Sequence, residues 1–235
     1  MITVDNNTKV HSRSSSPAFG NAMLQAVPSS EVYLMDCIQG MKHYPDKWFD
    51  LAIVDPPYGI GAGKKSFQSG TRKSYNHTDK DWDLSVPHME YFTELFRVSK
   101  NQIIWGANYF FEHLPKTKGV IIWDKIQDFS GADFELAWTS FDKVAKAFRM
   151  SRVEAYTGKV KIHPTQKPIE LYDFCFNFAK VEAGMKVLDT HLGSQSSRIS
   201  ANKYQLNFVG FETDEEYYNK GNKRYDDFIS QTRMF

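Results

Sequence analysis

Residues 48–58 read WFDLAIVDPPY, an apolar run that ends in an acidic turn with two prolines. The run predicts a buried strand over 48–54, because short apolar segments bounded by turn residues are typical of such strands. Both prolines fix φ and neither carries an N–H, so Asp55-Pro56-Pro57-Tyr58 predicts a stiff turn at the carboxyl end of the strand. Ligands of parallel α/β sheets bind at this end of the strands, which makes the turn a candidate site.

The rest of the chain alternates short apolar strands with helical patterns from residue 31 onward. This alternation predicts the α/β class, with a mainly parallel sheet covered by helices on both faces and one domain over 31–235. Residues 1–30 are polar and Ser-rich, which predicts an arm or strap outside that domain. Further strands are expected at 31–35, 102–105, 119–123, 135–140, 186–189 and 207–211, and helices at 87–98, 169–180, 195–203 and from a cap at Asp214.

The composition excludes several classes of protein. The 235 residues carry 29 Lys and Arg against 28 Asp and Glu, a net charge of +1. No run approaches the roughly 20 apolar residues of a membrane span, so a cytoplasmic protein is expected. Cys37 and Cys175 form no CxxC, which favours buried reduced thiols. The histidines show no metal-ligand spacing, and no metal site is predicted.

The DPPY turn offers an unusual set of acceptors. Its Asp55 carboxylate and Pro56 carbonyl are adjacent, and the prolines add no competing donor. Tyr58 adds an aromatic plane beside them. Two acceptors and a stacking face suit a planar ring that carries an exocyclic NH2. The alternative is a structural turn in which Asp55 caps local backbone and Tyr58 only packs.

A second candidate site follows the strand at 186–189. Gly193, in the turn THLGS at 190–194, would let the backbone approach a ligand closely. Glu212 ends the next strand, where dinucleotide-binding folds place an acid on the ribose hydroxyls. This arrangement is typical of nucleoside binding. The alternative is an ordinary structural turn followed by a surface Glu212, which would show the same sequence pattern. Lys167, in HPTQKP at 163–168, opens a helix and would suit a carboxylate, unless it is simply solvated.

Together, DPPY at 55–58, HPTQKP at 163–168 and the strand and turn at 186–194 resemble the amino-methylating DNA methyltransferases, in the permuted order of their β group. The resemblance implies a Rossmann-like fold dependent on S-adenosylmethionine (SAM), and methyl transfer to adenine N6 or cytosine N4 of a base flipped out of double-stranded DNA. An Asp-first DPPY favours adenine N6. The implied catalytic residues are Asp55, Pro56, Pro57 and Tyr58, and the implied cofactor residues are Asp36, Lys167, Asp189, Thr190, His191, Leu192, Gly193, Ser194 and Glu212.

The cofactor turn departs from the family's common DPFxGSGTT. Here it reads DTHLGSQSS, with Gln195 in place of a Gly and His191 in place of the Phe that packs beside SAM. SAM would still fit if Gln195 took a helical φ and its side chain pointed away. Two rivals stay open: a SAM-deficient remnant that only binds DNA, and a SAM enzyme acting on a protein amide or an RNA base.

Two basic segments predict the DNA-binding surface, the loop 59–83 and the compact segment 141–162. They would form a one-sided basic face despite the net charge of +1, although solvated surface charge is the alternative. Membership of a restriction-modification system and a homodimer are further expectations from the resemblance. The basic side chains predicted to bind DNA are Lys64, Lys65, Arg72, Lys73, Arg149 and Arg152.

Overall fold

The fold is built on an eight-stranded sheet with the order β1-β8-β7-β2-β3-β5-β4-β6. The computed structural model describes residues 28–64, 80–127 and 132–232, so most of the predicted arm lies outside the described residues. The strands are β1 (Ser30–Leu34), β2 (Phe49–Val54), β3 (Ser99–Trp105), β4 (Val120–Asp124), β5 (Phe134–Thr139), β6 (Lys146–Arg149), β7 (Lys186–Asp189) and β8 (Asn207–Glu212).

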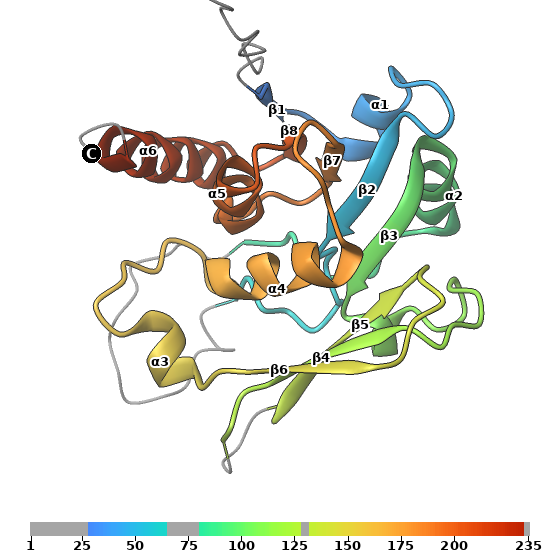
Figure 1. Ribbon diagram of the computed structural model, residues 1–235, viewed down its shortest axis with the longest axis horizontal. Coiled ribbons are helices and arrows are strands. Elements are labelled where there is room, and N and C mark those ends of the chain that lie inside the picture. The colour runs from blue at the N-terminus through green and yellow to red at the C-terminus, as the bar shows by residue number, and fades with distance from the viewer. Residues whose placement is uncertain (1–27, 65–79, 128–131, 233–235) are drawn as a thin grey trace, which may run out of the picture.

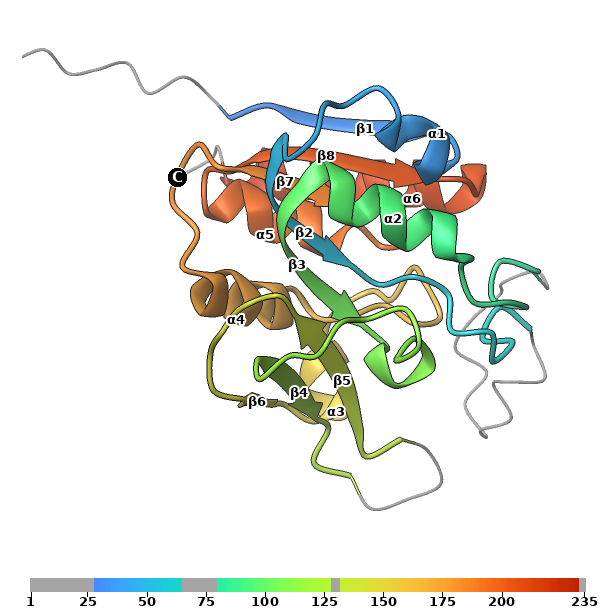
Figure 2. The ribbon, with the colours of Figure 1, turned by 90° about the vertical axis from the view of Figure 1, so that its right-hand side faces the viewer.

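The sheet is mainly parallel, as predicted. Only β5 runs against its neighbours, pairing antiparallel with β3 on one side and β4 on the other. The Rossmann-like class is therefore confirmed, with β4, β5 and β6 twisted away from the other strands in Figure 2. The helices are α1 (Cys37–Met41), α2 (Met89–Val98), α3 (Arg152–Tyr156), α4 (Ile169–Ala179), α5 (Ser196–Lys203) and α6 (Glu215–Thr232), with a 3-10 turn η2 (Ala107–Tyr109).

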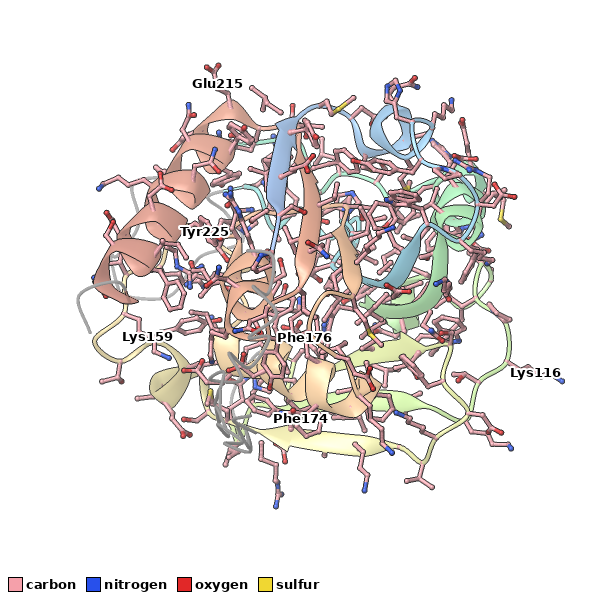
Figure 3. All side chains as sticks on the ribbon, turned by 45° about the horizontal axis from the view of Figure 1, so that its top comes forward. Lys116, Lys159, Phe174, Phe176, Glu215 and Tyr225 are labelled. Atoms are coloured by element: carbon pink, nitrogen blue, oxygen red, sulfur yellow. The ribbon has the colours of Figure 1, made fainter. Side chains whose placement is uncertain are left out.

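Helices cover the sheet from both sides, α1 and α2 on one and α4 and α5 on the other (Figure 1). Each side has its own apolar core. One core gathers Phe92, Leu95 and Phe211 on the α2 side. On the other side α4 uses two aromatic side chains in different directions (Figure 3): Phe176 is fully buried in the core, and Phe174 packs against Phe148 of β6.

Besides the 3-10 turn η2, three short elements were not expected from the sequence. The segment 143–167, which has no strong hydrophobic period, forms β6 and α3, and residues 37–41 form α1. β6 has four residues, three of them exposed, so no apolar run marks it. The helices α1 and α3 have five residues each, too few for a 3.6-residue period to be visible. Cys37 and Cys175 are buried free thiols, as predicted.

No helix in the described part of the chain is long and apolar enough to cross a membrane.

Replacing Phe176 tests the α4 core. Its side chain is fully buried, so Phe176→Ala should lower the free energy of unfolding by about 3–5 kcal/mol. Val160→Ala is the control, because Val160 is 79% exposed and should change it by less than about 0.5 kcal/mol. Urea denaturation measures both. Equal effects of the two substitutions would contradict this packing.

Candidate active site

Acidic residues from four neighbouring strands meet at one edge of the sheet. The strands β1, β8, β7 and β2 are parallel neighbours, so their carboxyl ends point the same way. Asp189 ends β7 and Glu212 ends β8, while Asp55 directly follows β2 and Asp36 lies two residues beyond the end of β1. Parallel pairing thus brings together the two candidate sites that the sequence predicted separately.

The Asp55 carboxylate is held from both oxygens. Its Oδ2 lies 2.5 Å from the Lys167 ammonium, and its Oδ1 accepts a hydrogen bond of 2.5 Å from the Tyr58 hydroxyl. Lys167 also donates to the Tyr58 hydroxyl at 3.2 Å. Each carboxylate oxygen can accept a second hydrogen bond, so Asp55 keeps acceptor capacity for a ligand.

Two charged residues that the sequence did not indicate extend this cluster. Glu135 of β5 lies 3.0 Å from the Lys167 ammonium, and its other oxygen lies 2.8 Å from the ammonium of Lys125. Lys167 is 3% exposed and Lys125 is 10% exposed. Acids and bases alternate from Asp55 to Lys125, and the four charges sum to zero. An acid within the apolar strand FELAWT was the available signal for Glu135.

The charges of the cluster shift its pKa values in opposite directions. Burial raises the pKa of Asp55, and the nearby Lys167 offsets this only in part. Burial alone would also raise the pKa of Glu135, but Lys167 and Lys125 outweigh it and lower the pKa to about 2. For Lys167 burial opposes the charge, yet the two carboxylates raise the pKa above its ordinary value. The ammonium and Glu135 are therefore charged at neutral pH.

The segment 163–168 joins the DPPY turn to the turn after β7. The Lys167 side chain reaches Asp55, while its carbonyl accepts a 2.7 Å hydrogen bond from the hydroxyl of Ser196 in α5. His163 packs against the turn, with its ring 3.5 Å from the point where a side chain on Gly193 would begin. The ammonium of Lys167 thus lies with Asp55 rather than in the turn, because the two buried carboxylates attract it.

Acids organise the turn at 190–194. Asp189 accepts the N–H of His191 at 3.0 Å and the hydroxyl of Ser197 at 2.5 Å, and burial raises its pKa to about 7. Glu212 accepts the N–H of Gly193 at 2.8 Å with Oε2, and two further backbone N–H groups with Oε1. Oε2 retains a free lone pair for a ligand hydroxyl. Asp36 caps α1 by accepting the N–H of Gln39 at 2.9 Å.

Gln195 has a left-handed φ of 57°, where the sequence analysis required a helical one. Its side chain nevertheless points away from the turn toward α6. The amide donates to Asn222 at 3.1 Å and accepts from Arg198 at 2.9 Å. Arg198 in turn lies 3.8 Å from the ring of Tyr225. Tyr225 is labelled on α6 in Figure 3. These partners hold the backbone in a conformation that favours glycine, and the side chain leaves the turn open.

His191 takes the place of the expected phenylalanine as a neutral ring. Burial lowers its pKa to about 4, so it carries no charge at neutral pH. The Tyr91 ring meets it edge-on at 5.4 Å, and Thr190 lies 2.9 Å from its Nδ1. Tyr91 also shares a hydrogen bond of 2.7 Å with Thr190. The imidazole therefore presents an uncharged aromatic surface beside the turn.

Asp83 fixes the shape of the DPPY turn and was not singled out from the sequence. It is 2% exposed and accepts three backbone N–H groups, from Tyr58 at 2.6 Å, Gly59 at 2.9 Å and Ala62 at 2.7 Å. Nearby, the Lys80 ammonium lies 2.6 Å from Asp214 and 2.8 Å from Glu216 of α6. Lys80 thus anchors the returning end of the loop to α6 and is engaged within the protein.

The predicted DNA-binding residues are only partly visible. Lys65, Arg72 and Lys73 lie outside the described residues. Lys64 pairs with Asp81, and Arg149 of β6 pairs with Asp124 at 2.9 Å while its side chain is 73% exposed.

Arg152 is exposed at the start of α3. Lys159, at the α3 end of the molecule in Figure 3, pairs with Glu170 at 2.5 Å. Within the described ranges, no group of three His, Cys, Asp or Glu side chains could hold a metal ion.

Comparison with known proteins identifies relatives by sequence. A DNA methylase family profile matches residues 121–223. The type II methyltransferase M.HinfI of Haemophilus influenzae is 25% identical over 80% of this chain and 66% of its own length. M2.MboI of Moraxella bovis is 22% identical over 83% of this chain and 86% of its own length. The chain thus spans just under two thirds of the first relative and most of the second.

Solved structures share the fold. The M1.HpyAVI–SAM complex superposes with a TM-score of 0.56 at 19% identity, over 83% of this chain and 98% of that one. The cytosine-N4-specific PvuII DNA methyltransferase gives a TM-score of 0.57 at 13% identity, over 87% and 93% of the two chains. These likenesses show a methyltransferase fold.

Removing the Asp83 carboxylate tests how the DPPY turn is held. Asp83→Ala leaves three backbone N–H groups without their acceptor and should lower the free energy of unfolding by about 2–3 kcal/mol. Asp81→Ala is the control, since Asp81 is 73% exposed, and it should change stability little. Chemical denaturation measures both. A stable Asp83→Ala protein would contradict the assigned role.

Proposed function

We propose that this chain is an amino-methylating DNA methyltransferase that transfers a methyl group from SAM to adenine N6 in double-stranded DNA, a proposal that the family profile and the type II methyltransferase relatives support. The observation that carries the proposal is the position of Asp55 beside the turn after β7. The strands β2 and β7 are direct neighbours, so the two acceptors of the DPPY turn lie next to a turn suited to a nucleoside. The DPPY turn can bind the target amine while the turn after β7 binds the methyl donor.

The turn at 190–194 fits a cationic nucleoside. Asp36 and the free lone pair of Glu212 offer acceptors for the adenosyl group, and the Gln195 side chain leaves the turn open. A neutral His191 tolerates the positive sulfonium, which a protonated imidazole would repel. When bound there, SAM supplies an electrophilic methyl group. Asp189, Thr190, Leu192 and Ser194 shape the rest of this proposed cofactor site.

Asp55 and Pro56 act on the target nitrogen. The Asp55 carboxylate and the Pro56 carbonyl accept the two amine hydrogens, which frees the lone pair from conjugation with the ring. Pro57 keeps the turn stiff. Correct positioning of two reactants supplies a large part of the rate of such a transfer.

Tyr58 provides the plane for the base. Its ring already stacks on Tyr109, with centroids 4.9 Å apart and 13° between the planes. The face covered by Tyr109 can accept a base only after Tyr109 moves. A Cβ on Gly106 would lie 2.1 Å from the Tyr58 ring, so glycine there is required for the ring to hold this position.

DNA would be held by the exposed cations around β6 and α3. Arg152 and Arg149 are placed on this part of the surface, and the weak exposed pair of Arg149 with Asp124 can exchange for a phosphate. Lys64 lies at the start of the loop that follows DPPY. A restriction-modification role and a homodimer stay predictions from the resemblance.

Labelled methyl transfer identifies the reaction. The protein is incubated with methyl-labelled SAM and DNA, and the nucleosides are then separated. We expect the label in N6-methyl-2′-deoxyadenosine of the DNA digest, because Asp55 begins the DPPY turn. Label in N4-methyl-2′-deoxycytidine would show that the target base is cytosine and not adenine. Transfer to protein or RNA only, or no transfer at all, would overturn the proposal.

Asp55 is the residue on which the reaction should depend most. Asp55→Ala should lower methyl transfer at least about 100-fold, since an acceptor aimed at the reacting group is lost. SAM binding, measured by calorimetry, should stay near the wild-type value because Lys167 keeps Glu135 as its partner. Asp50→Asn, at the opposite end of β2, is the control and should keep its activity. Surviving activity in Asp55→Ala would refute the assignment.

A further inference from the structure

We propose that Glu135 is a positioning residue for Asp55: it shares the Lys167 ammonium, which keeps the Asp55 carboxylate available to the target amine. This inference rests on the proposed function and deepens it. Glu135 lies outside the DPPY turn, the turn after β7 and the segment 163–168. It acts from β5, which the antiparallel pairing with β3 brings to the same site.

The distances show how the ammonium is divided. Lys167 lies 2.5 Å from Asp55 and 3.0 Å from Glu135, and it donates to the Tyr58 hydroxyl at 3.2 Å. An ammonium has three donors and one positive charge. With Asp55 as its sole acid partner, that charge would be neutralised by Asp55 alone. The second carboxylate draws part of the charge away, so Asp55 stays a stronger acceptor.

Lys125 makes this arrangement electrically possible. Two buried carboxylates around one ammonium would leave an uncompensated negative charge, which is costly in the interior. Lys125, 2.8 Å from the other oxygen of Glu135, supplies the missing positive charge and fixes that side chain. The main chain supports it, since the N–H of Lys125 donates to the carbonyl of Asp133 at 2.9 Å.

Several other groups face Asp55 and must be considered in any pH measurement. Tyr58 donates to it, and the negative charge of Glu135 opposes its ionisation while Lys167 favours it. The groups on the remaining elements that interact with Asp55 are Asp189 at the end of β7, Tyr91 of α2, Tyr172 of α4 and Tyr156 of α3. The tyrosine hydroxyls have pKa values raised by burial, and the pKa of Lys167 is raised by its two carboxylates, so among these groups only the acids change their charge in the acidic range.

Glu135→Gln tests the proposal because it keeps the shape and removes the charge. We expect kcat to fall at least about tenfold, with KM for DNA and SAM within about twofold of wild type, since the proposed role of Glu135 runs through Lys167 and requires no contact with either ligand. The acid limb of the kcat–pH profile should move to lower pH, because Asp55 ionises more easily without a neighbouring negative charge. Glu135→Asp, which restores the charge, should recover most of kcat and the wild-type profile.

A control variant separates positioning of Asp55 from the loss of a carboxylate–lysine pair elsewhere in the protein, here a largely exposed one. Glu170→Gln removes the carboxylate that pairs with Lys159 at the start of α4, and it should leave kcat and the pH profile unchanged. Thermal melting of all variants confirms that each is folded at the assay temperature. Wild-type kcat and pH profile in Glu135→Gln, with normal folding, would overturn the proposal.

A second readout does not depend on activity. The Asp55 carboxyl can be titrated by carbon-13 NMR in protein labelled at aspartate, with its signal assigned from Asp55→Asn. The titration should move to lower pH in Glu135→Gln and remain in place in Glu170→Gln. An unmoved titration would overturn the role of Glu135 even if the wild-type protein transferred no methyl, an outcome that would separately overturn the proposed function.

Discussion

The candidate site depends on one buried ammonium shared between two carboxylates. Lys167 joins Asp55 after β2 to Glu135 on β5, so it connects the parallel part of the sheet to the strand that runs against it. Moving charged side chains out of water costs free energy, and close ion pairing must compensate for this cost. Lys125 completes the compensation, and the resulting cluster is neutral although all four side chains are largely buried.

The same lysine connects the two halves of the site. Its side chain reaches the DPPY turn, its carbonyl accepts a bond from Ser196, and His163 of the same segment packs against Gly193. A shift of this segment would therefore move the amine acceptors and the nucleoside turn together. Such a connection suits a reaction in which two bound groups must meet in line, because small displacements lower the rate sharply.

The sequence predicts the parts of the site that follow strand ends, and it misses the parts that depend on tertiary pairing. Asp55, Gly193 and Glu212 could be located because carboxyl ends of parallel strands share one edge. Glu135 and Asp83 could not, since an acid in a strand or loop reveals its partners only after the chain has folded. Gln195 shows the same limit: its left-handed backbone is supported by Asn222 and Arg198, which come from two helices.

The most direct test of this account is a double-mutant cycle on Asp55 and Lys167, measured as the free energy of unfolding in urea. Breaking a buried ion pair from one side costs about 3–5 kcal/mol, because the remaining charge is left without a full partner. We predict that Asp55→Asn with Lys167→Met costs less than the sum of the single substitutions by at least about 1 kcal/mol. Additivity within about 0.5 kcal/mol would show that the two side chains do not stabilise each other, and would contradict the account.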